Sequence, residues 1–226
     1  MTSSTYSLLE DYMRSCMKDS AHDKEHIYRV LYTALAIAET ELDVNYDVLI
    51  CACLLHDIGR SEQFADPRLN HADVGADKAF SFLSGHGFSE NFTKTVCDCI
   101  RSHRYRKQNP PSTIEAKILF DADKLDVCGA IGIARTLLYK GIVGEPLYTL
   151  APDGSVLDGT TDTDPSFFQE YKYKLETIYD HFFTKEGARL AKTRQDAAAR
   201  YYQDLLSEMR AVYENNAERL YAHIEQ

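Results

Sequence analysis

Apolar side chains recur every three or four positions along most of this chain, and that helical periodicity restricts the folds open to it. The clearest stripe consists of Ile27, Val30, Leu31, Ala34, Ile37 and Ala38. Such spacing is typical of one face of an amphipathic helix. No run of alternating apolar and polar residues indicates a sheet. We therefore predict an all-α fold, a helical bundle with a C-terminal helical extension.

The expected helix boundaries follow from capping residues, glycines and prolines. Asp23 suits the N-cap of the first stripe, and Gly59 suits the end of the next helix. A further helix is predicted to begin after Ser112 or Thr113. The other predicted helices span about 46–57, 72–84, 89–103, 129–139, 166–184 and 186–224. We expect one domain over 1–226, with a core at about 20–140, a loop or lid at 141–165 and C-terminal helices at 166–226.

Composition and charge narrow the class of protein. With 226 residues, 44% of them hydrophobic and 27% charged, the chain can bury a globular core. It has no apolar run long enough to cross a membrane, and residues 1–15 lack the features of a secretory signal, so we expect a cytoplasmic protein. A net charge of −10 argues against a broad basic surface for nucleic acid. A phosphorylated small molecule remains compatible, because a metal ion and a few local cations can offset that charge.

The six cysteines do not form a zinc or disulfide pattern. Cys51 with Cys53, and Cys97 with Cys99, are two apart in helical segments. Side chains at that spacing point about 200° apart on a helix, so neither pair can readily hold one metal ion. We predict reduced cysteines, mostly packed in the core.

Three polar motifs interrupt the apolar pattern. A buried-type helix ends in His56-Asp57, His26 lies at the start of the first stripe, and three acids interrupt an apolar helix at Asp121, Asp123 and Asp126. A histidine and an aspartate at a helix end can be no more than a core histidine beside a solvated carboxylate. Three acids in an apolar helix, however, are costly unless a cation binds them. Asp123 is the acid best placed to face the core, whereas Asp121 and Asp126 could be caps or solvated charges.

The order and helical context of these motifs resemble the HD-domain metal-dependent phosphohydrolase superfamily, over residues 20–140. The finer pattern resembles its small stand-alone bacterial branch: Cys-Leu-Leu-His-Asp-Ile-Gly-Arg around His56, His71-Ala-Asp-Val-Gly-Ala, and Ala-Asp-Lys-Leu-Asp around Asp123. The resemblance implies hydrolysis of phosphate esters or anhydrides at a metal ion between the helices. Its implied ligands are His26, His56, Asp57 and Asp123.

The chemistry of this donor set agrees with that implication. Two imidazoles and two carboxylates suit Mn²⁺, Ni²⁺, Co²⁺, Fe²⁺ or Zn²⁺ better than Mg²⁺. Four protein ligands leave two positions of an octahedron open for water and a phosphate oxygen, and the ion lowers the pKa of that water.

His71 and His103 have three candidate roles. In binuclear relatives, histidines at similar places in the order bind a second metal ion, so these two could do so here. They could equally hydrogen-bond the substrate phosphate or transfer protons, or they could be structural.

Arg60 and Lys124 are the favoured phosphate contacts, because they adjoin the metal motifs. The alternative is that Arg60 pairs with Glu62 or Asp66, which would move the phosphate site toward Arg104 and Arg106. The alarmone-hydrolase relatives carry a Glu-Asp pair where this chain has Arg60 and Ser61, which argues against that activity. Glu62 is then one candidate for the general acid.

Within the branch, the resemblance most favours a nucleoside triphosphate pyrophosphohydrolase. The runner-up is a nucleoside monophosphate phosphatase or a cyclic-nucleotide phosphodiesterase, although the Gly-Tyr-Pro segment of cyclic-dinucleotide phosphodiesterases is absent after His103. A non-catalytic metal- or nucleotide-binding regulatory module and a purely structural metal site are the other hypotheses. The intact ligand set argues against the module, and its open positions argue against a structural site. The expected partner is a phosphorylated small molecule, in particular a nucleotide, and the sequence is compatible with a homodimer.

Overall fold

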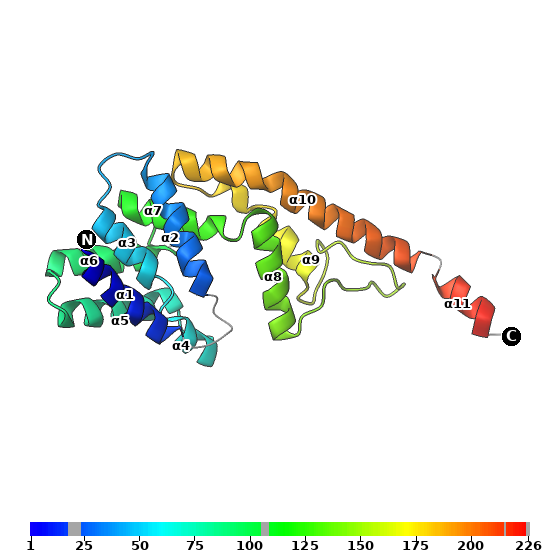
Figure 1. Ribbon diagram of the computed structural model, residues 1–226. Helices are drawn as coiled ribbons and strands as arrows, with labels where there is room; N and C mark the ends of the chain where they lie inside the picture. Colours follow the sequence, from blue (N-terminus) through cyan, green and yellow to red (C-terminus); the bar gives the residue numbers. More distant parts are fainter. Residues whose placement is uncertain (18–23, 105–108, 215, 225–226) are drawn as a thin grey trace. The chain divides into compact units, whose positions relative to one another are not determined.

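The computed structural model describes residues 1–17, 24–104, 109–214 and 216–224, and in this part of the chain the regular structure is helical, with no strand (Figure 1). The predicted all-α fold is confirmed. The chain divides into two compact units. Unit 1 comprises Met1–Asp126 and Phe182–Leu190, and unit 2 comprises Val127–His181 and Ala191–Gln226. The single domain expected from the sequence stays a prediction.

Unit 1 is a bundle of helices with mostly well-defined starts. The side chains of Asn45, Asn70, Ser89 and Thr113 each accept a hydrogen bond from a backbone N–H of the helix that follows. The predicted cap Asp23 lies outside the described residues. The helices are α1 (Ser3–Cys16), α2 (Lys24–Ala38), α3 (Tyr46–Leu55), α4 (Arg60–Ala65), α5 (His71–Gly85), α6 (Glu90–Ser102) and α7 (Ile114–Leu125).

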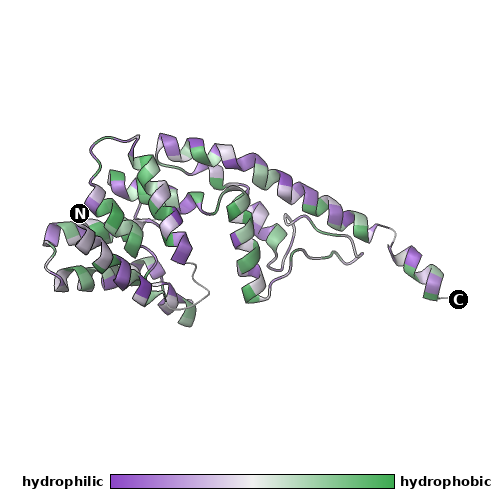
Figure 2. Ribbon diagram, in the orientation of Figure 1, coloured by the Kyte–Doolittle hydropathy of each residue, from purple (hydrophilic) through white to green (hydrophobic). Residues whose placement is uncertain are grey.

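Helix α3 forms the centre of unit 1. It packs against α1, α2, α5, α6 and α7, and Figure 2 shows it as an almost continuously apolar segment. Its buried residues are Val48, Leu49, Cys51, Ala52, Cys53, Leu54 and Leu55. A helix buried on nearly every side is held rigidly, so the residues at its end have defined positions.

Two details of unit 1 differ from the sequence prediction. The helix expected to reach residue 57 ends at Leu55, so His56 and Asp57 lie in the turn that follows. The helices α1 and α4 were not predicted, and α4 occupies part of the expected loop before Pro67. The cysteines are free, and five of the six are buried, as expected.

Unit 2 contains α8 (Gly129–Val143), α9 (Phe167–Glu170), the larger part of α10 (Lys185–Tyr213) and α11 (Asn216–Ile224). The expected continuous helix over 166–184 is wrong. A π-helical turn at Tyr171–Leu175 and a 3₁₀ turn at Ile178–Asp180 follow α9 instead. Tyr171 stacks on Tyr202 of α10 with ring centroids 4.0 Å apart, so tertiary packing accompanies the change in backbone.

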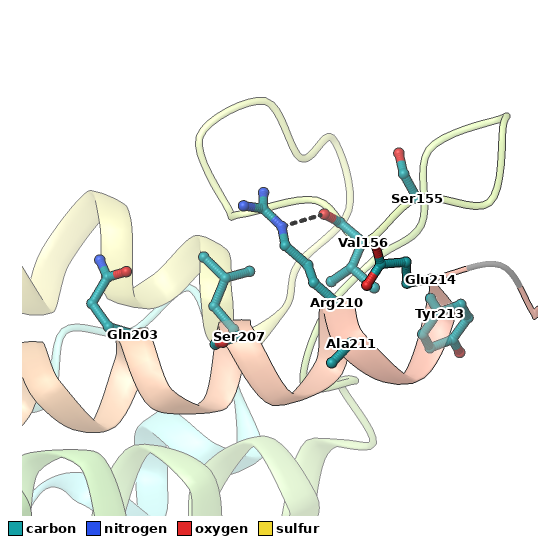
Figure 3. Close-up of a pocket in the computed structure, with 9 residues that line it drawn as sticks. Ser155, Val156, Gln203, Ser207, Arg210, Ala211, Tyr213 and Glu214 are labelled. Atoms are coloured by element: carbon teal, nitrogen blue, oxygen red, sulfur yellow. Dashed lines mark hydrogen bonds between the residues drawn. The ribbon is translucent and has the colours of Figure 1, made fainter.

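The expected loop begins where α8 ends, at Gly144, whose left-handed backbone terminates the helix. Its only regular pairing among the described residues is a bridge between Leu150 and Val156. A pocket of about 670 Å³ lies between this segment and α10, where Arg210 donates to the carbonyl oxygen of Val156 at 3.4 Å (Figure 3). No helix in the described part of the chain is both long and apolar enough to cross a membrane.

Candidate metal centre

The predicted metal ligands come from three helices of unit 1. His26 lies in the first turn of α2, His56 and Asp57 follow the last residue of α3, and Asp123 lies near the end of α7. Helices α2, α3 and α7 pack against one another. The histidines and Asp57 are buried, and Asp123 is partly exposed. The fold thus brings together four side chains that are widely separated in sequence.

The inward atoms of these four side chains form a tight group. His26 Nε2 lies 3.3 Å from His56 Nε2, 3.3 Å from Asp123 Oδ1 and 3.5 Å from Asp57 Oδ2. His56 Nε2 lies 3.7 Å from Asp57 Oδ2 and 4.0 Å from Asp123 Oδ1. Donors that share an ion at about 2.0–2.3 Å lie roughly 3–4 Å from one another. The spacing therefore fits one divalent cation.

A second group shares Asp57 with the first. Asp57 Oδ1, the oxygen turned away from His26, lies 3.3 Å from Nε2 of His71 and 3.6 Å from Nε2 of His103. The two imidazole Nε2 atoms lie 3.2 Å apart. His71 opens α5 and His103 follows the last residue of α6. Asp57 is thus placed between two groups of donors, each able to hold an ion.

The tautomers of two histidines follow from backbone contacts. His56 Nδ1 lies 2.8 Å from the carbonyl oxygen of Cys53, and His103 Nδ1 lies 2.6 Å from that of Ile100. A carbonyl oxygen can only accept, so each Nδ1 must carry the proton. In the neutral rings, Nε2 then presents its lone pair to the groups described above.

In the other two histidines, Nδ1 also carries the proton, and here it donates to a side-chain oxygen. Asp126 Oδ2 accepts from His26 Nδ1 at 2.7 Å. Gln63 Oε1 accepts from His71 Nδ1 at 2.7 Å, while Gln63 Nε2 donates to the carbonyl oxygen of Leu69 and so fixes the amide orientation.

All four Nε2 atoms therefore converge, in two close pairs. Two nitrogen lone pairs 3.2–3.3 Å apart repel unless a proton or a cation lies between them. Together with the carboxylates, this donor set fits bound divalent metal ions.

Burial controls the protonation of two of the four imidazoles. It lowers the pKa of His56 to about 4 and that of His71 to about 2, the latter with further lowering by Arg60 and His103. Both rings are therefore neutral at physiological pH. A neutral imidazole is the form that ligates a metal ion.

The carboxylates reverse this effect at His26. Burial acts to lower the pKa of His26, but hydrogen bonds to Asp123, Asp126 and Asp57 outweigh it and raise the pKa to about 10. Burial acts to raise the pKa of Asp57, yet Arg60 and the neighbouring histidines hold it well below the usual range. Asp57 is therefore ionised, and its negative charge attracts protons and cations to the centre.

The two cations predicted to contact phosphate, Arg60 and Lys124, lie in different surroundings. Arg60 Nε donates to Asp57 Oδ1 at 2.9 Å, so its side chain does reach back over the site. The alternative partners predicted from the sequence, Glu62 and Asp66, pair with Lys78 and Arg68 instead. Lys124 Nζ lies 5.2 Å from the ring centroid of Phe120, one turn earlier in α7. Arg104 donates to Asn70 Oδ1, beside His71. Of the other cations and histidines near the motifs, Arg106, Lys107 and His22 lie outside the described residues.

A glycine permits the close approach of Asp57 to the second group. A Cβ atom on Gly59 would lie 2.4 Å from the carbonyl oxygen of His71 and 2.6 Å from the backbone nitrogen of Gly75. The turn after α3 therefore packs directly on the start of α5. Gly59, expected from the sequence to end a helix, instead precedes α4 and allows this contact.

Three acids have side-chain contacts that the sequence did not predict. Asp121 is fully buried and accepts hydrogen bonds from Phe183 N, Thr184 N and Thr184 Oγ1, so it is neither a solvated charge nor a cap of its own helix. Asp126 is the C-cap residue of α7, as one of its two expected roles allowed, but its side chain is buried against His26 instead of solvated. Glu62 pairs with Lys78 at 2.7 Å, which helps to lower its pKa against the effect of burial. A lowered pKa is unsuited to a general acid at neutral pH.

Sequence reasoning missed the roles of Asp126 and Gln63. Asp126 follows Asp123 by three positions, and residues at that spacing share a helix face; this was the available signal. Nothing in the local sequence distinguishes Gln63. The pocket in unit 2 (Figure 3) has none of the predicted site residues in its lining.

Comparisons with known proteins agree with this fold. Residues 24–128 match the HD domain family, so the chain contains an HD domain and has the fold of the HD-superfamily hydrolases. The match spans all the residues of both donor groups.

Individual relatives match most of the chain. YpgQ of Bacillus subtilis is 26% identical over 199 residues, which cover 87% of this chain and 90% of YpgQ. Its crystal structure in complex with ADP has a TM-score of 0.67 and 26% identity, covering 88% of this chain and 97% of that one. An HD-superfamily hydrolase from Bacillus thuringiensis has a TM-score of 0.68 and 27% identity, with 91% and 97% covered.

Proposed function

We propose that this protein is a divalent-metal-dependent phosphohydrolase of nucleotides, and that it cleaves nucleoside triphosphates to monophosphates and pyrophosphate. The observation that carries the proposal is the convergence of four imidazole Nε2 atoms on the two carboxylates of Asp57 and Asp123. His26, His56, Asp57 and Asp123 would hold the first ion. His71 and His103, with Asp57, would hold a second. Mn²⁺, Ni²⁺, Co²⁺, Fe²⁺ and Zn²⁺ suit these donors better than Mg²⁺.

The reaction adds one water across the bond between the α- and β-phosphates. When bound, the cation supplies Lewis acidity, which lowers the pKa of water and polarises a phosphoryl oxygen. Arg60 would bind a phosphate oxygen beside Asp57; its planar fork, which suits phosphate, and its hydrogen bond from Nε to Asp57 support this role. His71 is neutral at physiological pH, with a pKa lowered to about 2, so its Nε2 can ligate an ion or accept a hydrogen bond but cannot serve as an acid.

Two observations support a nucleotide as the substrate. YpgQ, which is 26% identical to this chain, was crystallised with ADP. The site also combines acidic metal ligands with Arg60 and, near His71, Arg104. A polyphosphate carries more negative charge than one ion offsets, so additional local cations are needed in a chain of net charge −10.

The test is a substrate screen with metal-stripped protein. Nucleoside mono-, di- and triphosphates and cyclic nucleotides are offered with Mn²⁺, Ni²⁺, Co²⁺ or Mg²⁺ added back, and the products are separated by chromatography. We expect triphosphates to yield monophosphate and pyrophosphate only when metal is present. Asp57→Ala should abolish turnover, whereas His86→Ala, at an exposed position after α5, should not.

The other outcomes separate the rival hypotheses. Release of inorganic phosphate from monophosphates, or opening of cyclic nucleotides, would replace the pyrophosphohydrolase with the runner-up activities. Nucleotide binding without turnover under any metal would favour the regulatory module. Full activity in chelator, with metal content verified as nil, would overturn metal-dependent hydrolysis.

A further inference from the structure

Asp126 contacts one predicted metal ligand without belonging to either donor group. Its Oδ2 accepts from His26 Nδ1 at 2.7 Å. Arg29, one turn after His26 on α2, donates from Nε to Asp126 Oδ1 at 2.8 Å and from Nη2 to Oδ2 at 3.1 Å. The carboxylate is buried, whereas the arginine side chain is about one-third exposed. The three residues form a continuous chain from the protein surface to the metal centre.

We propose that Asp126 is a positioning residue that fixes the Nδ1–H tautomer of His26, and that Arg29 holds Asp126 in the orientation this requires. The inference rests on the proposed metal-dependent function. With Nδ1 protonated and held, the Nε2 lone pair of His26 faces His56, Asp57 and Asp123. An imidazole with the opposite tautomer would direct an N–H at the site and could not ligate an ion there.

The anchor of His26 differs from those of the other three histidines in the two groups. Those rings donate to neutral acceptors, namely the carbonyl oxygens of Cys53 and Ile100 and the amide oxygen of Gln63. A carboxylate accepts a stronger, charge-assisted hydrogen bond than a neutral oxygen. It also makes the opposite ring nitrogen a better donor to a metal ion. Asp126 therefore strengthens the first donor group specifically.

The Asp126–Arg29 contact makes an asparagine at position 126 a sharp probe. Both oxygens of Asp126 accept from Arg29, and one of them also accepts from His26. An asparagine of the same shape must turn its NH₂ group toward one of these sites. Toward Arg29, it opposes one N–H donor with another. Toward His26, it requires an unprotonated Nδ1 and so imposes the tautomer that cannot bind metal.

Relieving the conflict should restore binding, which a merely structural role does not predict. The experiment measures Mn²⁺ affinity by calorimetry for wild type, Asp126→Asn, Arg29→Met and the double variant. We expect Asp126→Asn to bind Mn²⁺ about 10- to 100-fold more weakly. Without Arg29, the asparagine is free to turn its oxygen to His26, so the double variant should bind more tightly than Asp126→Asn alone. A residue that only supports folding would show a double variant at least as impaired as the single one.

Two controls accompany the affinities. Asp77→Asn removes one exposed carboxylate from α5, where it pairs with Arg101, and should leave Mn²⁺ affinity unchanged. Far-UV circular dichroism establishes that each variant folds. If Asp126→Asn does not fold, Arg29→Met still tests the proposal, because loss of the orienting fork should weaken Mn²⁺ binding about 3- to 10-fold, at the lower end of such effects.

A spectroscopic readout reports the tautomer itself. In ¹⁵N-histidine-labelled protein loaded with Zn²⁺, which is diamagnetic, we expect His26 to carry its proton on Nδ1. A His26 ring protonated on Nε2 in wild type, or Mn²⁺ affinity unchanged in both Asp126→Asn and Arg29→Met, would overturn the proposal. These readouts measure binding and protonation. A wild-type protein that meets them but hydrolyses no nucleotide would overturn the proposed function and leave the role of Asp126 intact.

Discussion

Arg60 donates from Nε to Oδ1 of Asp57, the carboxylate oxygen that faces His71 and His103. The guanidinium therefore lies at the second donor group, on the carboxylate that the two groups share. A cation therefore lies beside the carboxylates of the centre, in a chain whose net charge is −10. It connects the two roles that a phosphohydrolase site must combine, holding metal ions and binding phosphate.

The first prediction concerns that arginine. Arg60→Ala should weaken nucleotide binding or turnover by about 1.5–3 kcal/mol, roughly 10- to 150-fold, because a hydrogen bond to a charged group is lost. Steady-state kinetics measure the change, and metal analysis should show unaltered metal content. Arg68→Ala is the matched control, since Arg68 is exposed and pairs with Asp66 in the same region. Unaltered kinetics in both Arg60→Ala and Lys124→Ala would instead assign the phosphates to cations such as Arg104.

The second prediction concerns the number of ions. If His71 and His103 hold a second ion with Asp57, elemental analysis at saturation should give two ions per chain. His103→Ala should then reduce the value to one, while His86→Ala, which changes an exposed histidine, should leave it at two. One ion per chain in wild type, with turnover falling in His103→Ala, would instead assign these histidines to phosphate or proton transfer.

The third prediction concerns protons. The pKa of His26 is raised to about 10, whereas those of His56 and His71 are lowered to about 4 and about 2. In metal-stripped protein at pH 7.5, only His26 of these three should hold a proton that the ion must displace. Binding of the first ion should then release about one proton, and affinity should increase as pH rises toward 10. Calorimetry in buffers of different ionisation enthalpy measures this release. Binding with no proton released would contradict the assignment of His26.

The fourth prediction concerns the close approach at Gly59. Gly59→Ala places a Cβ 2.4 Å from the carbonyl oxygen of His71 and 2.6 Å from the backbone nitrogen of Gly75. Both neighbouring atoms belong to the backbone, so neither can move without a large cost. We expect a loss of about 1–3 kcal/mol in the free energy of unfolding, measured by urea denaturation. Metal affinity should fall as well, because the turn that carries Asp57 is displaced. Gly85→Ala, where a Cβ meets nothing within 4 Å, is the control. Equal stability of the two variants would show that the backbone contact at Gly59 tolerates a Cβ atom.

Periodicity predicted α2 well, because the apolar stripe of that helix depends on local spacing alone. It failed over 166–184, where Phe168, Tyr171 and Leu175 keep a helical spacing although the backbone changes type. The stacking of Tyr171 on Tyr202 is a tertiary contact, and nothing within the segment encodes it.

The residues of the site likewise divide into those that a local motif identifies and those whose role depends on tertiary contacts. His56 and Asp57 could be recognised from a local motif, and the resemblance to a known family connected them to His26 and Asp123. The role of Asp126 depends on Arg29 and His26, which lie on another helix. An acid at the end of α7 can be solvated or buried, and only the packing of α2 on α7 decides between these states. Gln63 was missed for the same reason, since its contact with His71 joins two separate helices.

The most direct test of the metal centre is anomalous diffraction from crystals grown with Mn²⁺ and measured at the manganese absorption edge. We expect an anomalous difference peak enclosed by Nε2 of His26 and His56 and by carboxylate oxygens of Asp57 and Asp123. A second peak is expected beside Asp57, between His71 and His103. Crystals of verified manganese content that show no peak at the first position would contradict the assignment of these four residues as metal ligands.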